Sequence, residues 1–315
     1  MTDRNKSTLS ARIHALASEA QRATGFQAHT SAGFQEPKHY LPVPAARSMP
    51  IKLSTQNVAD IIGADGKIRR APRGAAVGAT VPMSAAIIRQ SIVARAGAHA
   101  IVREDNKTAI PAGKGIVFQR VPARLRLVEA ASFSHVPDGD DLPVSAIPVS
   151  EAEIDFAEAP SHGVRFNVPR SELKRVGDEI TYHEISIALT IGLARLVDRE
   201  LLKCLAAADL AEFSLARIAG QGIRFDEVRA IVGRGAHGAA VGADGVLRAA
   251  GLPADLTGDT EMTFAGAWDR AGIAIYDDVQ LLIERTNTRG STAFTVWANV
   301  VPLVPDLSKF WKVTA

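Results

Sequence analysis

One stretch of the sequence has the residue types and spacing of a known chemical motif. Gly233, Gly235 and Gly238 follow the apolar residues 230–232 and match the glycine fingerprint of dinucleotide-binding proteins letter for letter. In that motif the backbone approaches a pyrophosphate, which lies at the N-terminus of the next helix. Here Gly242 and Gly245 come next, and two further glycines disfavour such a helix. We expect a glycine-rich loop at 233–245, with dinucleotide binding as the alternative.

The other residue types that perform catalysis or bind metals lack a productive spacing. No two histidines lie three or four residues apart with a carboxylate between them, and Cys204 is the single cysteine. The acidic turn at 138–141 lacks the rest of a calcium-binding loop, and no nucleophile elbow or phosphate-binding loop occurs. We expect no catalytic, cofactor-binding or metal-binding residues. The histidines are at positions 14, 29, 39, 99, 135, 162, 183 and 237.

The composition is that of an ordinary globular chain. Of its 315 residues, 47% are hydrophobic and 22% are charged, which argues against wholesale disorder. No apolar run approaches the roughly 18 residues that a membrane-spanning helix needs. The first twenty residues also lack the apolar region of a secretory signal. These features predict a soluble protein made in a reducing cytoplasm.

Charge is distributed unevenly along the chain. Residues 1–128 carry 19 Lys and Arg against 7 Asp and Glu, whereas residues 129–158 carry eight acids and no Lys or Arg. A basic arm of this kind binds nucleic acid or an acidic protein surface. Because the same chain supplies an acidic segment of similar size, we favour self-association through these two regions. Two separate solvated surfaces are the alternative, since exposed ion pairs are weak.

The N-terminal third has the pattern of an arm. A Ser or Thr cap at position 7, 8 or 10 begins a predicted helix that runs through Ala20, and four prolines keep residues 25–50 extended. Short apolar pieces precede a second predicted helix over 83–96. Since the region lacks a core of its own, we expect it to lie on another surface.

Strands are predicted from residue 98 onward. Residues 98–102, 116–121, 124–128 and 163–168 have strand patterns, and 104–115 is rich in turn residues. We interpret 115–168 as one long two-stranded excursion that is too polar to hold a core by itself.

The longest predicted element is a helix over 182–207, where apolar residues recur at three-to-four spacing. Gly192 in its middle suggests the close approach of another backbone. An α/β region with a short apolar run at 225–232 follows. The strands predicted at 273–276, 279–283 and 293–303 include a hairpin, and the chain closes on Phe310 and Trp311.

The order of these elements resembles the major capsid protein of tailed bacteriophages, which has the Hong Kong 97-like fold. The closest local likenesses are VRFNVPRSEL at 164–173 and the helical ISIALTIGLARLVDRELL at 185–202. Residues 273–305 are similar to the closing β-hairpin of that family. The likeness covers most of 80–315 and rests on the order of the parts.

The resemblance implies an α+β fold with five parts. These are an N-terminal arm with short helices (1–97), strands with an extended E-loop hairpin (98–168), the spine helix of a P-domain (169–207), an A-domain (208–272), and a closing β-hairpin with the C-terminal tail of the P-domain (273–315). The glycine loop at 233–245 would lie in the A-domain near a capsomer axis.

The resemblance also implies a structural protein and no enzyme. Its copies would form pentamers and hexamers of an icosahedral shell enclosing phage double-stranded DNA. Expected partners are other copies, scaffolding, portal or decoration proteins, and packaged DNA through non-specific contacts, with no membrane. The expected location is the virion, after assembly in the bacterial cytoplasm.

Two family features are not expected here. Some members crosslink an E-loop lysine to a neighbour's asparagine, but no lysine occurs from Gly115 to Leu173; Lys107 and Lys114 lie only at the loop base. Other members begin with a removable scaffolding segment, whereas the first hundred residues here have the pattern of the arm. We therefore expect a separate scaffold or none.

Three alternatives stay open at this stage. An encapsulin-type compartment shares the fold and encloses protein cargo. A nucleotide-binding enzyme would use the Gly233–Gly238 loop. A DNA-binding module would use the basic arm, although its few aromatics (Phe26, Phe34 and Tyr40) do not indicate base stacking.

Overall fold

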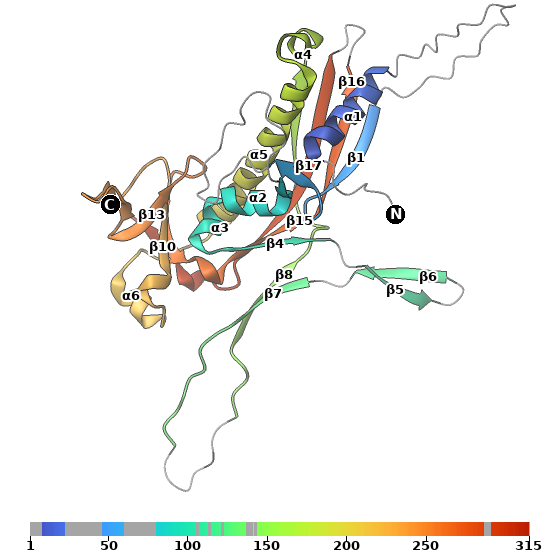
Figure 1. Ribbon diagram of the computed structural model, residues 1–315. Helices are drawn as coiled ribbons and strands as arrows, with labels where there is room; N and C mark the ends of the chain where they lie inside the picture. The colour runs from blue at the N-terminus through green and yellow to red at the C-terminus, as the bar shows by residue number, and fades with distance from the viewer. Residues whose placement is uncertain are drawn as a thin grey trace, which may run out of the picture. The chain divides into compact units, whose positions relative to one another are not determined.

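The computed structural model describes residues 8–22, 46–59, 80–104, 107–112, 115–120, 123–136, 141, 144–286 and 291–314 (Figure 1). The chain divides into two compact units. Unit 1 comprises Met1–Gln90, Pro160–Ala194 and Tyr276–Asn299, and unit 2 comprises Ser91–Ala159, Arg195–Ile275 and Val300–Ala315. Helices and strands are mixed in both units, which confirms the predicted α+β class. No helix within the described ranges is long and apolar enough to cross a membrane.

Unit 1 is built on an antiparallel sheet in the order β1-β16-β17-β9. Alternate residues of β16 and β17 are buried on one face, as the period of a strand requires (Val279, Leu281, Ile283, Phe294, Val296 and Ala298). The predicted hairpin at 279–303 is therefore confirmed. The strands are β1 (Ala46–Lys52), β16 (Asp278–Arg285), β17 (Thr292–Leu303) and β9 (Ser161–Val168), with the last four residues of β17 in unit 2.

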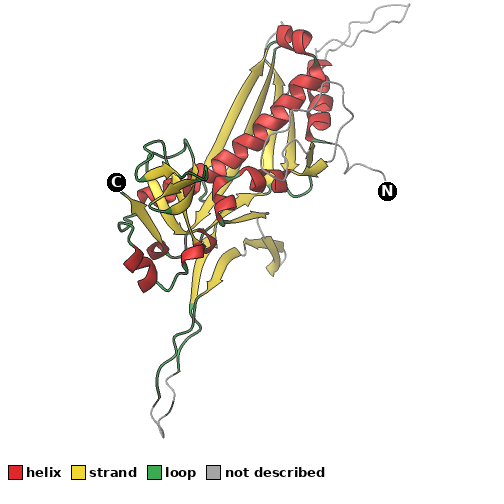
Figure 2. Cartoon of the chain, turned by 60° about the vertical axis from the view of Figure 1, so that its left-hand side comes forward, coloured by secondary structure: helices red, strands yellow, loops and turns green. Residues whose placement is uncertain are grey.

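The predicted long helix is α5 (Asp178–Ala207), which belongs to unit 1 as far as Ala194. In unit 1 it lies along the buried face of the sheet (Figure 2), where the rings of Tyr182 and Phe294 are 5.8 Å apart. It begins four residues earlier than predicted, after Gly177, whose φ of 98° ends the preceding α4 (Arg170–Val176). The expected close approach at Gly192 is wrong, because this residue is exposed and a Cβ there would meet nothing within 4 Å.

The predicted first helix is α1 (Leu9–Arg22), which packs on β16 and β1. Its cap is Thr8, whose Oγ1 accepts a hydrogen bond from the amide of Ala11 (3.3 Å). One side of α1 is fully buried, and His14 meets the edge of the Tyr182 ring at 5.5 Å. This part of the arm thus lies on another surface, as expected. Residues 23–45, which include most of the expected extended stretch, fall outside the described residues.

The single helix predicted over 83–96 is wrong. The structure has α2 (Met83–Gln90) in unit 1 and α3 (Ile92–Ala96) in unit 2. Ser91 between them has an extended backbone, and its Oγ accepts a hydrogen bond from the amide of Ala94 at 3.1 Å. A serine that caps a new helix in this way ends the preceding one. In unit 1, α2 follows the short hairpin of β2 (Asn57–Ala59) and β3 (Thr80–Pro82).

Two β-hairpins of unit 2 occupy the region where we expected one excursion. Strand β5 (Lys107–Ala112) pairs with β6 (Gly115–Arg120), and β7 (Ala123–Val128) pairs with β8 (Val149–Ile154). The expected turn-rich segment 104–115 therefore contains a strand, and only the second hairpin is a long excursion. The strand predicted at 163–168 is β9, which belongs to the sheet of unit 1.

A second sheet lies in unit 2, in the order β11-β12-β13-β10-β14-β18. Its core contains Ile218 of α6 (Leu215–Gly220), Val228, Leu252 and Trp311. Strand β10 is parallel to β13, and the other pairs are antiparallel. The strands are β10 (Val228–Val232), β11 (Ala239–Val241), β12 (Leu247–Ala249), β13 (Leu252–Leu256), β14 (Thr263–Ala267) and β18 (Phe310–Val313).

The C-terminal residues belong to this second sheet. We grouped residues 310–313 with the closing hairpin, but β18 instead pairs with β14. The reason is aromatic packing, since the Phe310 ring meets the Trp268 ring edge to face at 5.3 Å and both are buried. Elsewhere in unit 2, β15 (Gly272–Tyr276) pairs with the end of β17 and with β4 (His99–Arg103).

Alanine substitutions at two glycines test these packing assignments, because they should change the free energy of unfolding in opposite directions. We expect Gly192→Ala to raise the free energy of unfolding by about 0.5–1 kcal/mol, because alanine favours a helix and meets no neighbour there. Gly266→Ala should lower it by about 1–3 kcal/mol, because its Cβ would lie 2.3 Å from Cδ1 of Phe310. Urea denaturation of the unassembled protein measures both values. Two changes of the same sign would contradict the packing described here.

Candidate functional site

The hairpin of β7 and β8 carries the first candidate site. Its register places Arg124 opposite Glu153 and Arg126 opposite Glu151. Arg124 forms ion pairs with Glu151 at 3.1 Å and with Glu153 at 3.8 Å, and Arg126 pairs with Glu151 at 3.0 Å. Part of the acidic segment is therefore neutralised by arginines of its own hairpin. At these exposed positions each pair contributes about 1 kcal/mol or less.

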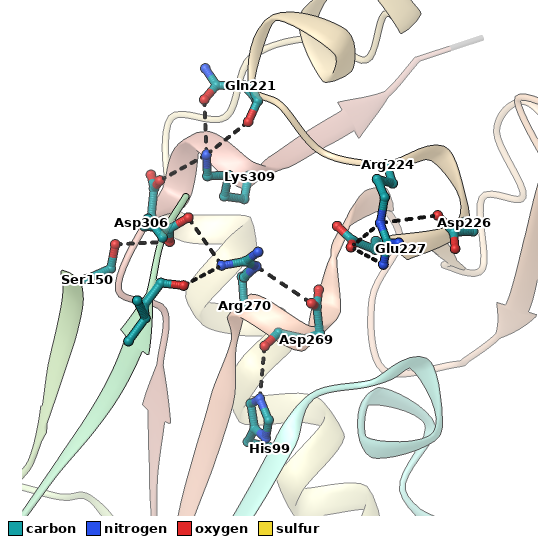
Figure 3. Close-up of polar contacts among 12 residues, drawn as sticks. His99, Ser150, Gln221, Arg224, Asp226, Glu227, Asp269, Arg270, Asp306 and Lys309 are labelled. Atoms are coloured by element: carbon teal, nitrogen blue, oxygen red, sulfur yellow. Dashed lines mark hydrogen bonds and ion pairs between the residues drawn. The ribbon is translucent and has the colours of Figure 1, made fainter. Parts of the chain in front are cut away.

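The base of this hairpin is fixed to unit 2 by a small apolar core and a charged contact. Leu125 and Ile154 pack with Ala274 and Leu303. Next to them the guanidinium of Arg270 lies 3.2 Å from the carboxylate of Glu129. The hydroxyl of Ser150 donates a hydrogen bond to the same carboxylate at 3.2 Å (Ser150 and Arg270 are labelled in Figure 3). The amide of Glu129 donates to the carbonyl of Pro148 at 2.9 Å, which closes the base.

Beyond this base, the described part of the loop exposes large apolar side chains. Phe133 is 98% exposed, Val144 102% and Ile147 75%. Within the described residues of 130–147, no backbone hydrogen bond is formed. Figure 1 shows the described loop segments extending from β7 and β8 with no element of unit 2 over them. Exposed apolar groups gathered on one segment in this way are typical of a surface for association.

The glycine fingerprint does not form a dinucleotide site. Strand β10 is followed by turns and then by β11, so no helix begins in this described segment. The amide of Gly233 donates to the carbonyl of Met262 (3.0 Å), and that of Arg234 donates to the carbonyl of Thr260 (2.9 Å). Two amides of the loop are thus hydrogen-bonded within unit 2, and the segment lacks the helix N-terminus on which the dinucleotide motif depends.

Close backbone packing explains instead why position 233 is a glycine. A Cβ there would lie 2.5 Å from the carbonyl oxygens of both Met262 and Thr260, so only glycine lets the two chain segments approach this closely. The loop is therefore a structural contact between the end of β10 and the segment before β14.

The scattered histidines do not assemble into a site in the described part of the chain. No group of three or more His, Cys, Asp or Glu that could hold a metal ion occurs among the described residues. His99 contacts the carbonyl of Asp269 at 2.9 Å (Figure 3), and His135 is exposed. His29 and His39 fall outside the described residues. Burial raises the pKa of the Cys204 thiol, which disfavours the reactive thiolate.

Sequence reasoning did not identify the buried carboxylate of Asp198. Asp198 on α5 is 2% exposed, and its Oδ1 accepts hydrogen bonds from the Ser91 hydroxyl (2.6 Å) and the Val93 amide (3.1 Å). Burial raises the pKa of Asp198 to about 6, although these hydrogen bonds act in the opposite direction and Asp259 nearby adds repulsion. Asp198 holds the start of α3 against α5 within unit 2. Its only sequence signal is a charged residue adjoining the apolar stripe of the helix.

Comparisons with solved structures find capsids among the similar folds. A capsid of an empty GTA particle has a TM-score of 0.47 at 11% identity, covering 78% of this chain and 94% of that one. The capsid of Cyanophage P-SCSP1u has a TM-score of 0.43 at 11% identity, covering 69% and 86%. A structure from Gordonia phage Cozz has a TM-score of 0.44 at 15% identity, covering 82% and 95%.

No protein-family model matches the chain, and a sequence search of curated proteins finds no match.

Asp198 predicts a specific pH dependence of stability. Its pKa is above the value of the unfolded chain, so the folded state retains the proton between about pH 4 and 6. The stability from this group is present at low pH and is lost as pH rises through 6. A shift of two pKa units corresponds to about 3 kcal/mol.

In Asp198→Asn this group no longer titrates. We expect the free energy of unfolding of the variant to lose about 3 kcal/mol less than that of the unmodified protein between pH 4 and 7. Urea denaturation at a series of pH values measures the difference. Asp141→Asn, at an exposed position, serves as the control and should follow the unmodified protein. Parallel pH curves for Asp198→Asn and the unmodified protein would contradict the assignment.

Proposed function

We propose that this chain is the structural subunit of a phage-type capsid and that its copies associate through the loop of the β7–β8 hairpin. The observation that carries the proposal is the exposure of Phe133, Val144 and Ile147 on a loop with no covering element in unit 2. Fully burying an apolar side chain of this size stabilises a contact by about 1.5–3 kcal/mol. Ordering the extended loop costs conformational entropy. A protein surface of another molecule supplies the burial that offsets this cost.

A second copy is the partner that fits best. The described acidic residues of the loop region that remain exposed and without an ion pair include Asp141 and Glu158. The excess of Lys and Arg over residues 1–128 supplies the opposite charge on every copy. Complementary charges of this kind set the register of an association and its rate more than its strength. Repetition over many copies then favours a closed assembly.

The order of parts also supports this reading. An arm with a helix on a sheet, a long hairpin loop, a long helix, a second sheet and a strand hairpin follow one another along the chain. In the proposed subunit these are the N-terminal arm (1–97), the E-loop region (98–168), the spine helix (169–207), the A-domain (208–272) and the closing hairpin with its C-terminal tail (273–315), whose last strand β18 joins the second sheet. The subunit has a structural role and no catalytic role.

The proposed particle is an icosahedral shell of pentamers and hexamers that encloses double-stranded DNA in a virion. Scaffolding, portal or decoration proteins are its further partners. Light scattering and negative-stain microscopy of the purified protein test this directly. Shells or capsomers support the proposal, and a protein that stays monomeric at all concentrations, also with co-expressed scaffold, contradicts it. Nuclease-treated particles that contain protein cargo and no DNA would instead identify a compartment.

The loop residues give the sharpest mutational test. We expect the combined variant Phe133→Asn, Val144→Asn and Ile147→Asn to reduce the yield of assembled particles more than tenfold, since each tenfold corresponds to about 1.4 kcal/mol. The free energy of unfolding of the unassembled variant should change by about 0.5 kcal/mol or less, because all three side chains are exposed. Ile180→Asn, at a residue 46% exposed on α5, is the matched control. Equal particle yields for the two variants would refute the role of the loop.

Salt tests the electrostatic part of the proposal. Raising ionic strength from about 0.1 M to about 1 M shortens the screening length from roughly 10 Å to 3 Å. If the basic arm faces the acidic loop of another copy, the rate and yield of assembly should fall over this range, as measured by light scattering. A rate that does not change with salt would show that the charges do not meet.

A further inference from the structure

The exposed face of α5 carries a line of basic side chains in unit 2. Arg195, Arg199 and Lys203 follow one another at intervals of four residues, so they lie on one face of the helix. At a rise of about 1.5 Å per residue the line is about 12 Å long. Arg195 and Lys203 are exposed, and the Arg199 side chain is 52% exposed. We call these three residues the basic stripe.

The acidic residues within the span of the basic stripe do not offset its charge at the surface. Asp198 and Glu200 are only 2% and 7% exposed, and Glu200 pairs with the Nε of Arg199 at 3.2 Å. Neither Arg195 nor Lys203 forms an ion pair with another described residue. The surface along this part of α5 is therefore cationic.

Ordinary helix stabilisation does not explain the basic stripe. Like charges four residues apart repel each other and destabilise a helix. The helix dipole favours cations only in the last turn, and the last turn of α5 contains no basic residue. A helix face that only meets solvent is typically laced with charges of both signs. The repetition of one sign therefore indicates a partner with many negative charges.

The shape of this face fits a straight polyanion. Ala188 and Gly192 continue the line toward the N-terminus, and a Cβ on Gly192 would meet nothing within 4 Å. The exposed acids Glu184 and Asp209 lie beyond its two ends. Over residues 185–207 no large apolar side chain is exposed, whereas a protein interface normally has an apolar core. A phosphate backbone, in contrast, is bound by cations alone.

From these observations we propose that the basic stripe binds the phosphate backbone of the double-stranded DNA that the assembled copies enclose. The inference rests on the proposed capsid function and adds the surface of the subunit that meets the DNA. Duplex DNA carries about one negative charge per 1.7 Å of its axis, so a stripe of about 12 Å spans about seven phosphates. Residues 185–207 contain no aromatic, Asn or Gln side chain, so the contact depends on charge and reads no base sequence.

Removal of two cations tests the contact in the full chain. The variant combines Arg195→Gln and Lys203→Gln, and the probe is a fluorescent duplex of about 30 base pairs whose anisotropy reports binding to the unassembled protein. Each phosphate contact adds about 0.9 to the slope of log affinity against log salt concentration. We therefore expect the slope of the variant to be smaller by about 2, equally for duplexes of different sequence.

The matched control combines Arg229→Gln and Lys174→Gln. It also removes one exposed arginine and one exposed lysine that form no ion pair with a described residue. Its salt slope should change by less than half as much. Because Gln has nearly the helix propensity of Arg and Lys, circular dichroism should show the same helix content in both variants. Equal slopes for the stripe variant and the control would overturn the proposal.

Filled particles provide a second readout at Lys203. In DNA-filled particles its amine should be protected from acetylation by acetic anhydride, and release of the DNA should restore its reactivity, as measured by mass spectrometry. Emptied particles retain the same shell contacts, so the difference reports the DNA alone. Equal reactivity of Lys203 before and after release, whether high or low, would refute the contact.

Assembly distinguishes DNA from an acidic surface of another copy. If the stripe variant keeps its salt slope but forms fewer particles, the basic stripe meets the acidic segment 129–158 of another copy, and the DNA contact is wrong. If the unmodified protein assembles and neither readout changes, the DNA contact is wrong while the capsid proposal stands. If the unmodified protein never assembles, the capsid proposal fails, and the contact with enclosed DNA fails with it.

Discussion

Packing of α5 on the face of β16 and β17 is the interaction on which unit 1 depends. Tyr182 lies at its centre, between the rings of His14 and Phe294, so it joins α1, α5 and the sheet in one contact. Every strand of this sheet except the edges has hydrogen-bonded neighbours on both sides. Because α1 packs on this sheet and on Tyr182, its apolar side is buried without a separate core for the arm.

In unit 2 the apolar side chains differ widely in their burial. Its two small cores, one under α6 and one at the base of the β7–β8 hairpin, bury their residues almost completely. The loop beyond Glu129 and the turn at 256–262 retain exposed apolar groups that neither core can cover. In a chain that acts alone such groups are a liability, whereas in a subunit they are contact surfaces. The proposed assembly is therefore the state in which the apolar surface of this chain is buried.

The glycine-rich loop has the residue spacing of a dinucleotide-binding motif without the backbone structure that binds the ligand. The spacing of Gly233, Gly235 and Gly238 is that of a phosphate-binding turn, yet no helix follows it and the amides of Gly233 and Arg234 donate to the segment before β14. The glycines are required because two backbones meet closely, which is the same steric reason that glycine serves in the true motif. The chemical outcome differs because the element that follows is a strand.

The sequence by itself determined the features encoded by neighbouring residues. The periodicity of α5, the alternation in β16 and β17 and the Ser/Thr cap of α1 are local signals, and each predicted the right element. The sequence did not indicate that Phe133, Val144 and Ile147 would be exposed, because they lie in a segment that we interpreted as a polar excursion. Tertiary structure decided the pairing of β18 with β14, the place of β9 in the sheet of unit 1 and the burial of Asp198. The contact between Ser91 and Asp198 joins residues 107 positions apart, and strand pairing likewise depends on distant partners. Such choices are made by burial and hydrogen-bond satisfaction in the folded chain, which no local pattern records.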